Sequence, residues 1–172
     1  MPNDLTDKIE RHTIAVLVDN EPGVLARVIG LFSGRGYNIE SLTVAEIDKA
    51  NNLSRITVVT SGTRMIIEQI KAQLDRLVPV HLVHDLTDEG PSVERELALV
   101  KVASSGEKRI EAMRIAEIFK ARVVDATLNS FIFELTGTAA ELEDFIGLMD
   151  QLGLVEVSCT GVVAMSRGAS GF

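Results

Sequence analysis

The amino-acid sequence predicts an α+β fold made of two tandem βαββαβ units. A Gly-Thr pair followed by apolar residues at helical spacing occurs twice, and each residue of the second copy is numbered 75 above its counterpart. Each copy is preceded by a strand, a helix and a hairpin pattern, and is followed by one more apolar run. The matched positions are Gly62, Thr63, Ile67, Ile70, Leu74 and Leu77, and Gly137, Thr138, Leu142, Phe145, Met149 and Leu152.

The elements of the first half follow from local patterns. A continuous apolar run at Thr13–Val18 indicates a buried strand, and Pro22–Arg35 has a helical stripe closed by glycines. The polar turn at Asp48–Asn52 separates two strand patterns and indicates a hairpin. The two hairpin strands, the second helix and the closing strand are predicted at Ile39–Val44, Leu53–Thr60, the stripe after Thr63, and Val80–Leu86.

The second half repeats this order with a shorter hairpin. Its elements are predicted at Leu97–Ala103, Glu107–Lys120, Val123–Val124, Ser130–Leu135, the stripe after Thr138, and Leu154–Cys159. Threonine before each second helix is a favoured N-cap residue. Two interleaved right-handed βαβ crossovers form a four-stranded antiparallel sheet with both helices on one face, which is the ferredoxin-like arrangement.

These elements divide the chain into four predicted segments. Residues 1–11 are a flexible extension, 12–87 the first domain, 88–95 a linker with a Gly-Pro breaker, and 96–172 the second domain.

In the first strand, residues on both faces are apolar, whereas a half-solvated strand alternates with polar residues. We therefore expect the second face to be covered by the other half or by another subunit, and we predict at least a dimer.

Composition and charge exclude several classes. Hydrophobic residues make up 46% and charged residues 24% of the chain, so the sequence is not that of a disordered protein. The net charge of −8 argues against nucleic acid as a partner. The longest apolar run has five residues, Ile14–Val18, too short to span a membrane. The polar N-terminus lacks a secretion signal, so we expect a cytoplasmic protein.

The most informative stretch joins the first strand to the first helix, at residues 19–25. Asn20 is a suitable N-cap, and Gly23 allows a ligand to approach the backbone closely. The helix start presents unpaired N–H groups that suit a carboxylate or phosphate, although a capped helix without a ligand would have the same sequence. Val24 and Leu25 belong to the predicted core stripe, and Gly34 or Gly36 is predicted to end the helix in a left-handed conformation.

Two of these segments resemble a known family. The stretch Asp19-Asn20-Glu21-Pro22-Gly23-Val24-Leu25 and the stretch Gly36-Tyr37-Asn38-Ile39-Glu40-Ser41-Leu42 resemble an ACT domain, a module that senses small molecules. More narrowly, residues 11–168 resemble the regulatory small subunit of acetolactate synthase, also called acetohydroxyacid synthase. Residues 27–33, 93–97 and 161–168 support the narrower resemblance.

The resemblance implies a regulatory role without an active site. It implies a partner, the large catalytic subunit, which would carry thiamine diphosphate, Mg²⁺ and FAD, with no cofactor on this chain. It also implies activation of that partner and feedback inhibition by valine, with leucine or isoleucine as other effectors, in branched-chain amino-acid biosynthesis. The effector would lie where two ACT domains of a homodimer meet. The residues expected to bind it are Asn20, Gly23, Val24, Leu25, Asn38 and Ile39.

Other readings of the sequence remain open. A free-standing amino-acid sensor of another enzyme would share these residues, and an acylphosphatase-like hydrolase would use Arg27 and Asn38. His81 and His84 face opposite sides of a strand and are not expected to bind a metal. Cys159 is the only cysteine and is expected to be a small buried apolar residue.

Overall fold

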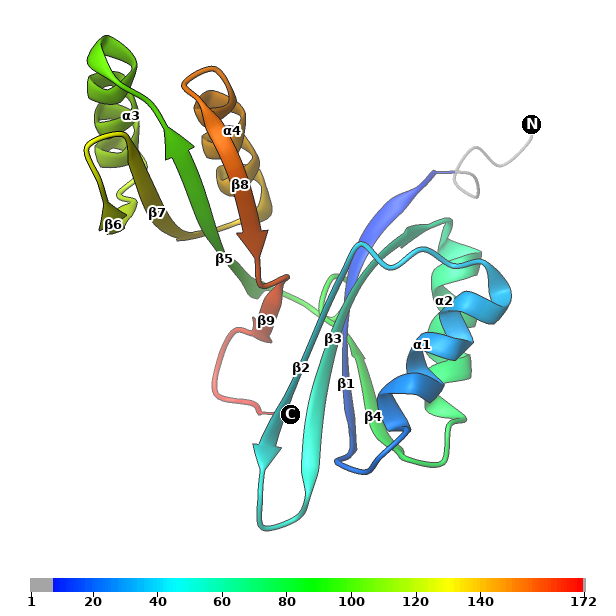
Figure 1. Cartoon of the computed structure of the whole chain (residues 1–172). Coiled ribbons are helices and arrows are strands. Elements are labelled where there is room, and N and C mark those ends of the chain that lie inside the picture. Colours follow the sequence, from blue (N-terminus) through cyan, green and yellow to red (C-terminus); the bar gives the residue numbers. More distant parts are fainter. Residues whose placement is uncertain (1–7, 172) are drawn as a thin grey trace, which may run out of the picture. The chain divides into compact units, whose positions relative to one another are not determined.

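A computed structural model describes residues 8–171 of the chain, which form two compact units. Of these residues, the first unit contains 8–93 together with 162–171, and the second contains Glu94–Gly161. Figure 1 shows that each unit has a sheet with two helices on one face. The predicted α+β class and the doubled βαββαβ order are confirmed.

The first unit follows the predicted element order, and its sheet has the strand order β2-β3-β1-β4. All neighbouring strands are antiparallel. The central strands are therefore β1 and β3, and β2 is an edge strand. The elements are β1 (Glu10–Asp19), α1 (Val24–Arg35), β2 (Ser41–Asp48), β3 (Leu53–Gly62), α2 (Arg64–Asp75) and β4 (Val80–Asp85).

The core of the first unit lies between the sheet and its two helices. The helices contribute the positions predicted from the stripe of α2 and three positions of α1. Leu25 is 38% exposed, so it does not belong to the α1 core stripe as predicted. The buried members of this core are Ile14, Val16, Val18, Val24, Val28, Phe32, Ile56, Val58, Ile67, Ile70 and Leu74.

The other face of the first sheet is covered by the end of the chain. Val162 and Ala164 pack against Ala15, Val59 and Leu86, and all five are buried. The strand β9 (Val163–Ser166) in this segment was not predicted. This contact explains why the first strand is apolar on both faces.

Hydrogen bonds fix this segment on the first sheet. The Val162 N–H donates to Ser41 Oγ at 2.7 Å, and the Val162 carbonyl accepts from Thr43 Oγ1 at 3.1 Å. The Arg55 guanidinium donates to the Ala164 carbonyl at 2.7 Å. Burial of this guanidinium lowers the pKa of Arg55 from its ordinary value.

The domain boundaries differ from the prediction at three places. The second unit spans 94–161 rather than 96–172, because the final segment returns to the first sheet. The predicted linker 88–95 is shorter, since β5 begins at Ser92. The predicted extension 1–11 ends earlier, because Glu10 and Arg11 pair with the end of β3. Residues 1–7 of that extension lie outside the described part of the chain.

The second unit has the sheet order β6-β7-β5-β8. Its core includes three phenylalanines, Phe131, Phe133 and Phe145, packed among aliphatic residues. Cys159 is exposed rather than buried, because it lies at the end of the edge strand β8. The elements are β5 (Ser92–Ala103), α3 (Gly106–Ile118), β6 (Arg122–Ala126), β7 (Ser130–Gly137), α4 (Ala139–Asp150) and β8 (Leu154–Cys159).

The helix caps match the prediction in three of four places where one was made. Thr63 and Thr138 cap α2 and α4, and Thr138 forms a reciprocal capping box with Glu141. Gly36 ends α1 with φ of 69°. Asn20 is not the N-cap of α1, because the chain turns at Gly23 and the helix begins at Val24. Among residues 8–171, no helix is long and apolar enough to cross a membrane.

Candidate functional site

The loop between β1 and α1 is fixed to the hairpin end of the first sheet. The Asn20 N–H donates to the Asn52 carbonyl at 2.7 Å, and Asn52 Nδ2 donates to the Asn20 carbonyl at 3.2 Å. The Asn20 side chain is exposed, and its Nδ2 donates to Glu46 Oε1 at 3.3 Å. Asn20 therefore connects the loop to the end of β2 instead of capping the helix.

Gly23 leaves the start of α1 open to an approaching ligand. Its φ of 87° lies in the left-handed region that favours glycine, and an added Cβ would meet nothing within 4 Å. No side chain caps this helix, and its first turn contains no acidic residue. The Val24 N–H donates to the Glu21 carbonyl at 3.3 Å, and intrahelical bonding begins with the Arg27 N–H. The N–H groups of Leu25 and Ala26 and the positive end of the helix dipole therefore face an open surface that suits an anion.

The two residues after Gly23 have different surroundings. The Val24 side chain is 6% exposed and packs in the core, so only its backbone can contribute to a binding site. Leu25 is 38% exposed beside the helix start. Of these two expected effector residues, only Leu25 has an exposed side chain that a ligand could contact.

Asn38 and Ile39 lie at the opposite end of α1. The Asn38 side chain is exposed, and the Asn38 backbone carbonyl accepts from Thr60 Oγ1 at 2.6 Å. Ile39 is half-buried against the core of the first unit. A 12-residue helix is about 18 Å long, so the length of α1 separates these residues from the Gly23 loop. Within one chain, the six predicted effector residues therefore form two groups.

The same separation bears on the hydrolase interpretation. Arg27 is exposed one turn into α1, whereas Asn38 follows the other end of this helix. An acylphosphatase-like site needs the guanidinium and the amide on one substrate. The structure does not bring these two groups together within one chain.

Residues that sequence reasoning missed connect this region to the end of the chain. Glu46 holds Asn20, and Ser41 and Thr43 hold Val162. All three lie on β2, the edge strand that begins just after Ile39. No periodicity or motif in the sequence relates β2 to a residue about 120 positions later, so the contact could be found only in the structure.

A buried polar cluster lies where β1 and β4 of the first sheet run side by side. His12 Nδ1 and Asp85 Oδ2 are 2.9 Å apart, and both side chains are almost fully buried. His12, Asp85 and Asp88 could together hold a metal ion by spacing. However, Lys71 Nζ already lies 3.4 Å from Asp85 Oδ2 and 4.0 Å from Asp88 Oδ2. The ammonium group supplies the positive charge that this cluster requires.

The charge on Lys71 is stabilised by these carboxylates. Burial disfavours the ammonium form, but contacts with Glu68 and Asp85 outweigh it and hold the pKa of Lys71 above its ordinary value. The other two histidines are paired elsewhere. His81 Nε2 lies 2.6 Å from Asp19, and His84 Nδ1 lies 2.8 Å from Glu89. They do not converge on a common site.

Two family models match the chain, one for each repeat. Residues 14–81 match a model described as an AHAS small subunit-like ACT domain. Residues 95–168 match a model described as the small subunit of acetolactate synthase. The first range lies within the first unit, and the second covers the second unit and continues into the final segment that packs on the first sheet.

Curated relatives match over nearly the full chain. A probable acetolactate synthase small subunit from Archaeoglobus fulgidus is 49% identical over 158 residues, covering 92% of this chain and 98% of the relative. The small subunit of acetolactate synthase isozyme 3 from Escherichia coli K12 is 47% identical over 159 residues, covering 92% and 96%.

A solved structure has the same arrangement of elements. The crystal structure of an acetolactate synthase small subunit from Thermotoga maritima matches with a TM-score of 0.83 and 39% sequence identity. The match covers 94% of this chain and 99% of that one.

Proposed function

The chain belongs to the acetolactate synthase small-subunit family, and from this premise we propose that it is a regulatory subunit that binds valine. In this proposal, it associates with the large catalytic subunit, increases its activity and makes that activity sensitive to valine. The chemistry takes place on the large subunit, with thiamine diphosphate, Mg²⁺ and FAD. This chain contributes the effector site and the contact that transmits its state.

The observation that carries the proposal is the free edge of β2. Among residues 8–171, this strand is paired only with β3. A two-fold axis at its edge would pair it antiparallel with β2 of a second copy. The start of β2 in one copy would then lie beside the end of β2 in the other. Asn38 and Ile39 precede the start, and Asn20 is bonded to Glu46 at the end. Dimerisation would therefore bring together the two groups of predicted effector residues.

The surface beside this edge supports such a pairing. Val44 is 44% and Ile47 is 52% exposed on β2, and Leu25 is exposed nearby at the start of α1. An unpaired edge strand with exposed apolar side chains readily adds another strand. Pairing would bury these side chains and satisfy the outer N–H and C=O groups of β2.

The joined site would supply the three groups that an apolar amino acid requires. The first-turn N–H groups of α1 would bind the carboxylate. The Asn38 amide from the other copy would accept a hydrogen bond from the ammonium. Leu25 and Ile39 would line an apolar slot, where the additional methylene of leucine changes affinity by only about 1–3 kcal/mol.

Regulation requires that the effector distinguish two arrangements of the complex. A site divided between two chains meets this requirement, because a small rotation of one domain against the other changes the distance between its halves. By linkage, the large subunit would change the affinity for valine by the same factor as valine changes the affinity for the large subunit. Calorimetric titrations of valine with and without saturating large subunit would measure this factor. Equal affinities would exclude regulation through binding.

The decisive experiment uses the reconstituted complex. Acetolactate formation is measured with purified large subunit and increasing valine, for the wild-type chain and two variants. Asn38→Ala removes the amide, and Gly23→Asn adds a side chain that tolerates the left-handed conformation. Both are expected to activate the large subunit normally but to lose inhibition by valine.

Asn129→Ala, an exposed asparagine of the second unit, is the matched control and should retain full sensitivity. Unchanged valine inhibition in both Asn38→Ala and Gly23→Asn would contradict the proposed site. Failure of the wild-type chain to change the activity of the large subunit would contradict the proposed function. In that case, the free-standing sensor is the remaining alternative.

A further inference from the structure

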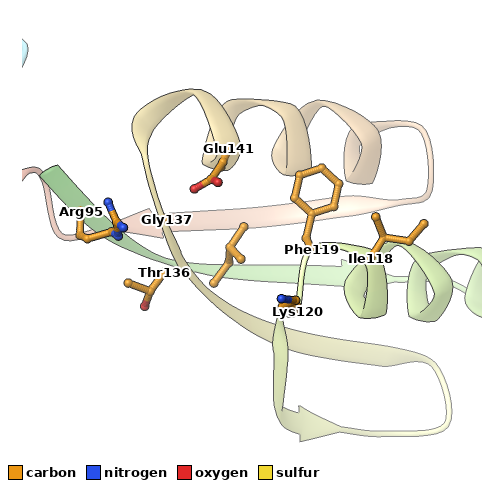
Figure 2. A pocket seen from close by; sticks show the side chains of 8 residues that line it. Arg95, Ile118, Phe119, Lys120, Thr136, Gly137 and Glu141 are labelled. Carbon is orange, nitrogen blue, oxygen red and sulfur yellow. The ribbon is translucent and has the colours of Figure 1, made fainter. Parts of the chain in front are cut away.

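The second unit contains a pocket of about 470 Å³ that the proposed function does not use. Figure 2 shows its position between the end of α3, the end of β7 and the start of α4. Arg95 enters from the start of β5, Lys120 follows α3, and Glu141 lies in the first turn of α4. Pockets of this volume are in the range of those that bind metabolites.

The pocket has an apolar floor beside its charged groups. Leu135 is 4% exposed, and Phe119 packs against the core cluster of the second unit. Ile118 is 75% exposed at the rim. A ligand with an aliphatic side chain would cover Ile118 and exclude water from this floor.

The charged groups that line the pocket do not neutralise one another. In the part of the chain that the structure describes, no carboxylate lies within ion-pair distance of Arg95 or Lys120. Glu141 Oε2 accepts the Thr138 N–H at 2.8 Å, and Oε1 has no hydrogen-bond partner among residues 8–171. Arg95 Nη1 donates to the backbone carbonyl of Glu94 at 2.6 Å. The other guanidinium N–H groups of Arg95, the Lys120 ammonium and one Glu141 oxygen thus remain available around a single cavity.

The backbone at Lys120 is a second, independent observation. Its φ is 57°, in the left-handed region that non-glycine residues rarely adopt. The equivalent position after α1 is Gly36, with φ of 69°. Asn52 is the other non-glycine residue with positive φ among the described residues, and asparagine tolerates this conformation. A lysine in place of glycine after α3 is unfavourable for the backbone, but it places an ammonium group in the pocket lining.

We propose that this pocket binds a free α-amino acid with an aliphatic side chain. The carboxylate of the ligand lies between the Arg95 guanidinium and the Lys120 ammonium. The ligand ammonium donates to Glu141 Oε1, and the side chain covers Leu135, Phe119 and Ile118. The site is formed by one chain alone, and it is independent of the effector site proposed between two ACT domains, the seam site.

The test follows backbone amide signals of the full chain by NMR during a titration with L-valine. The Asn38→Ala variant serves as the background, because the proposed seam site is disabled in it. The signals of Lys120 and Gly137 are expected to shift and saturate. Valinamide lacks the carboxylate, isovalerate lacks the ammonium, and each should bind at least about tenfold more weakly, because charge-assisted hydrogen bonds are lost.

Two variants separate binding from folding. Arg95→Gln and Lys120→Gly should abolish the shifts at Gly137. Lys120→Gly should at the same time raise the midpoint of thermal unfolding by a few degrees, since glycine relieves the left-handed backbone. Arg122→Gln is the matched control, because Arg122 is paired with Glu134 outside the pocket, and it should bind valine normally.

The outcomes distinguish this proposal from the preceding one. Shifts at Gly137 that persist in Arg95→Gln and Lys120→Gly would overturn it. No shift at these signals up to the solubility limit of valine would also overturn it, whatever the result at the seam. Loss of valine inhibition in Asn38→Ala, with retained shifts at Gly137, is the result expected if both proposals hold.

Discussion

Replacing Val162 by alanine tests whether the end of the chain stabilises the first unit. Val162 is 3% exposed and packs on the sheet face opposite the helices. Its neighbour Val163, the first residue of β9, is 55% exposed. The pair of variants Val162→Ala and Val163→Ala therefore makes the same chemical change in a buried and in an exposed environment.

The expected effect follows from the buried volume that is lost. Removing two methyl groups from a buried site costs about 0.8 kcal/mol for each group in transfer free energy, and the cavity adds to this. Val162→Ala should thus lower the free energy of unfolding by about 1.5–3 kcal/mol. With an m-value of about 1–3 kcal/mol per molar urea, the midpoint should fall by about 1 M. Val163→Ala should change stability by less than about 0.5 kcal/mol.

Tyrosine fluorescence makes the assay specific for the first unit. The chain has one tyrosine and no tryptophan, so Tyr37 alone dominates the signal. Tyr37 packs against the core of the first unit, with its ring edge-on to Phe32 at 6.2 Å between centroids. Urea unfolding monitored by this signal reports the stability of the unit to which Val162 is assigned.

Assigning the final segment to the first unit or to the second unit predicts different results. If residues 162–171 stabilise the first unit, the tyrosine transition of Val162→Ala shifts while that of Val163→Ala does not. Equal tyrosine transitions for Val162→Ala and the wild type, with a shift seen only by circular dichroism, would refute the assignment.

Two further predictions concern local interactions. Thr138→Ala removes the capping box with Glu141 and should destabilise the second unit by about 1–2 kcal/mol. Circular dichroism should detect this loss while the tyrosine transition stays unchanged. A shifted tyrosine transition would contradict this. Because the pKa of Lys71 is raised in the folded chain, its stabilising contribution is complete below the unfolded pKa of about 10.4 and is lost as pH rises through the higher folded value. The stability difference between the wild type and Lys71→Gln, from urea titrations, should therefore be constant near neutral pH and diminish above pH of about 10.4; a difference that grows there would contradict this.

The sequence predicted the elements whose signals are local. The repeated Gly-Thr pairs marked the N-caps of α2 and α4, and Thr63 and Thr138 cap these helices through their side chains. The first sheet is four-stranded and antiparallel, as the ferredoxin-like arrangement predicted, and β2 lies at its edge. These predictions succeeded because caps and periodic patterns depend on neighbours within a few residues.

The candidate site was predicted less completely. Asn20 was taken as an N-cap by its residue type, but Gly23 redirects the chain and Asn20 bonds to Glu46 across the loop. Val24 was expected both in the core stripe of α1 and at the effector site, and its side chain is buried in the core. The family resemblance identified the residues, but it did not show that α1 separates Asn38 from the Gly23 loop.

By itself, the sequence determined the doubling of the chain, its α+β class and the residues of the resemblance, because hydrophobic periodicity and capping are encoded in short segments. Only the tertiary structure showed that the final segment covers the first sheet, with Val162 bonded to Ser41. It also placed Arg95, Lys120 and Glu141 around one pocket. Such contacts join residues far apart in sequence, and their positions depend on how the packed elements bring those residues together.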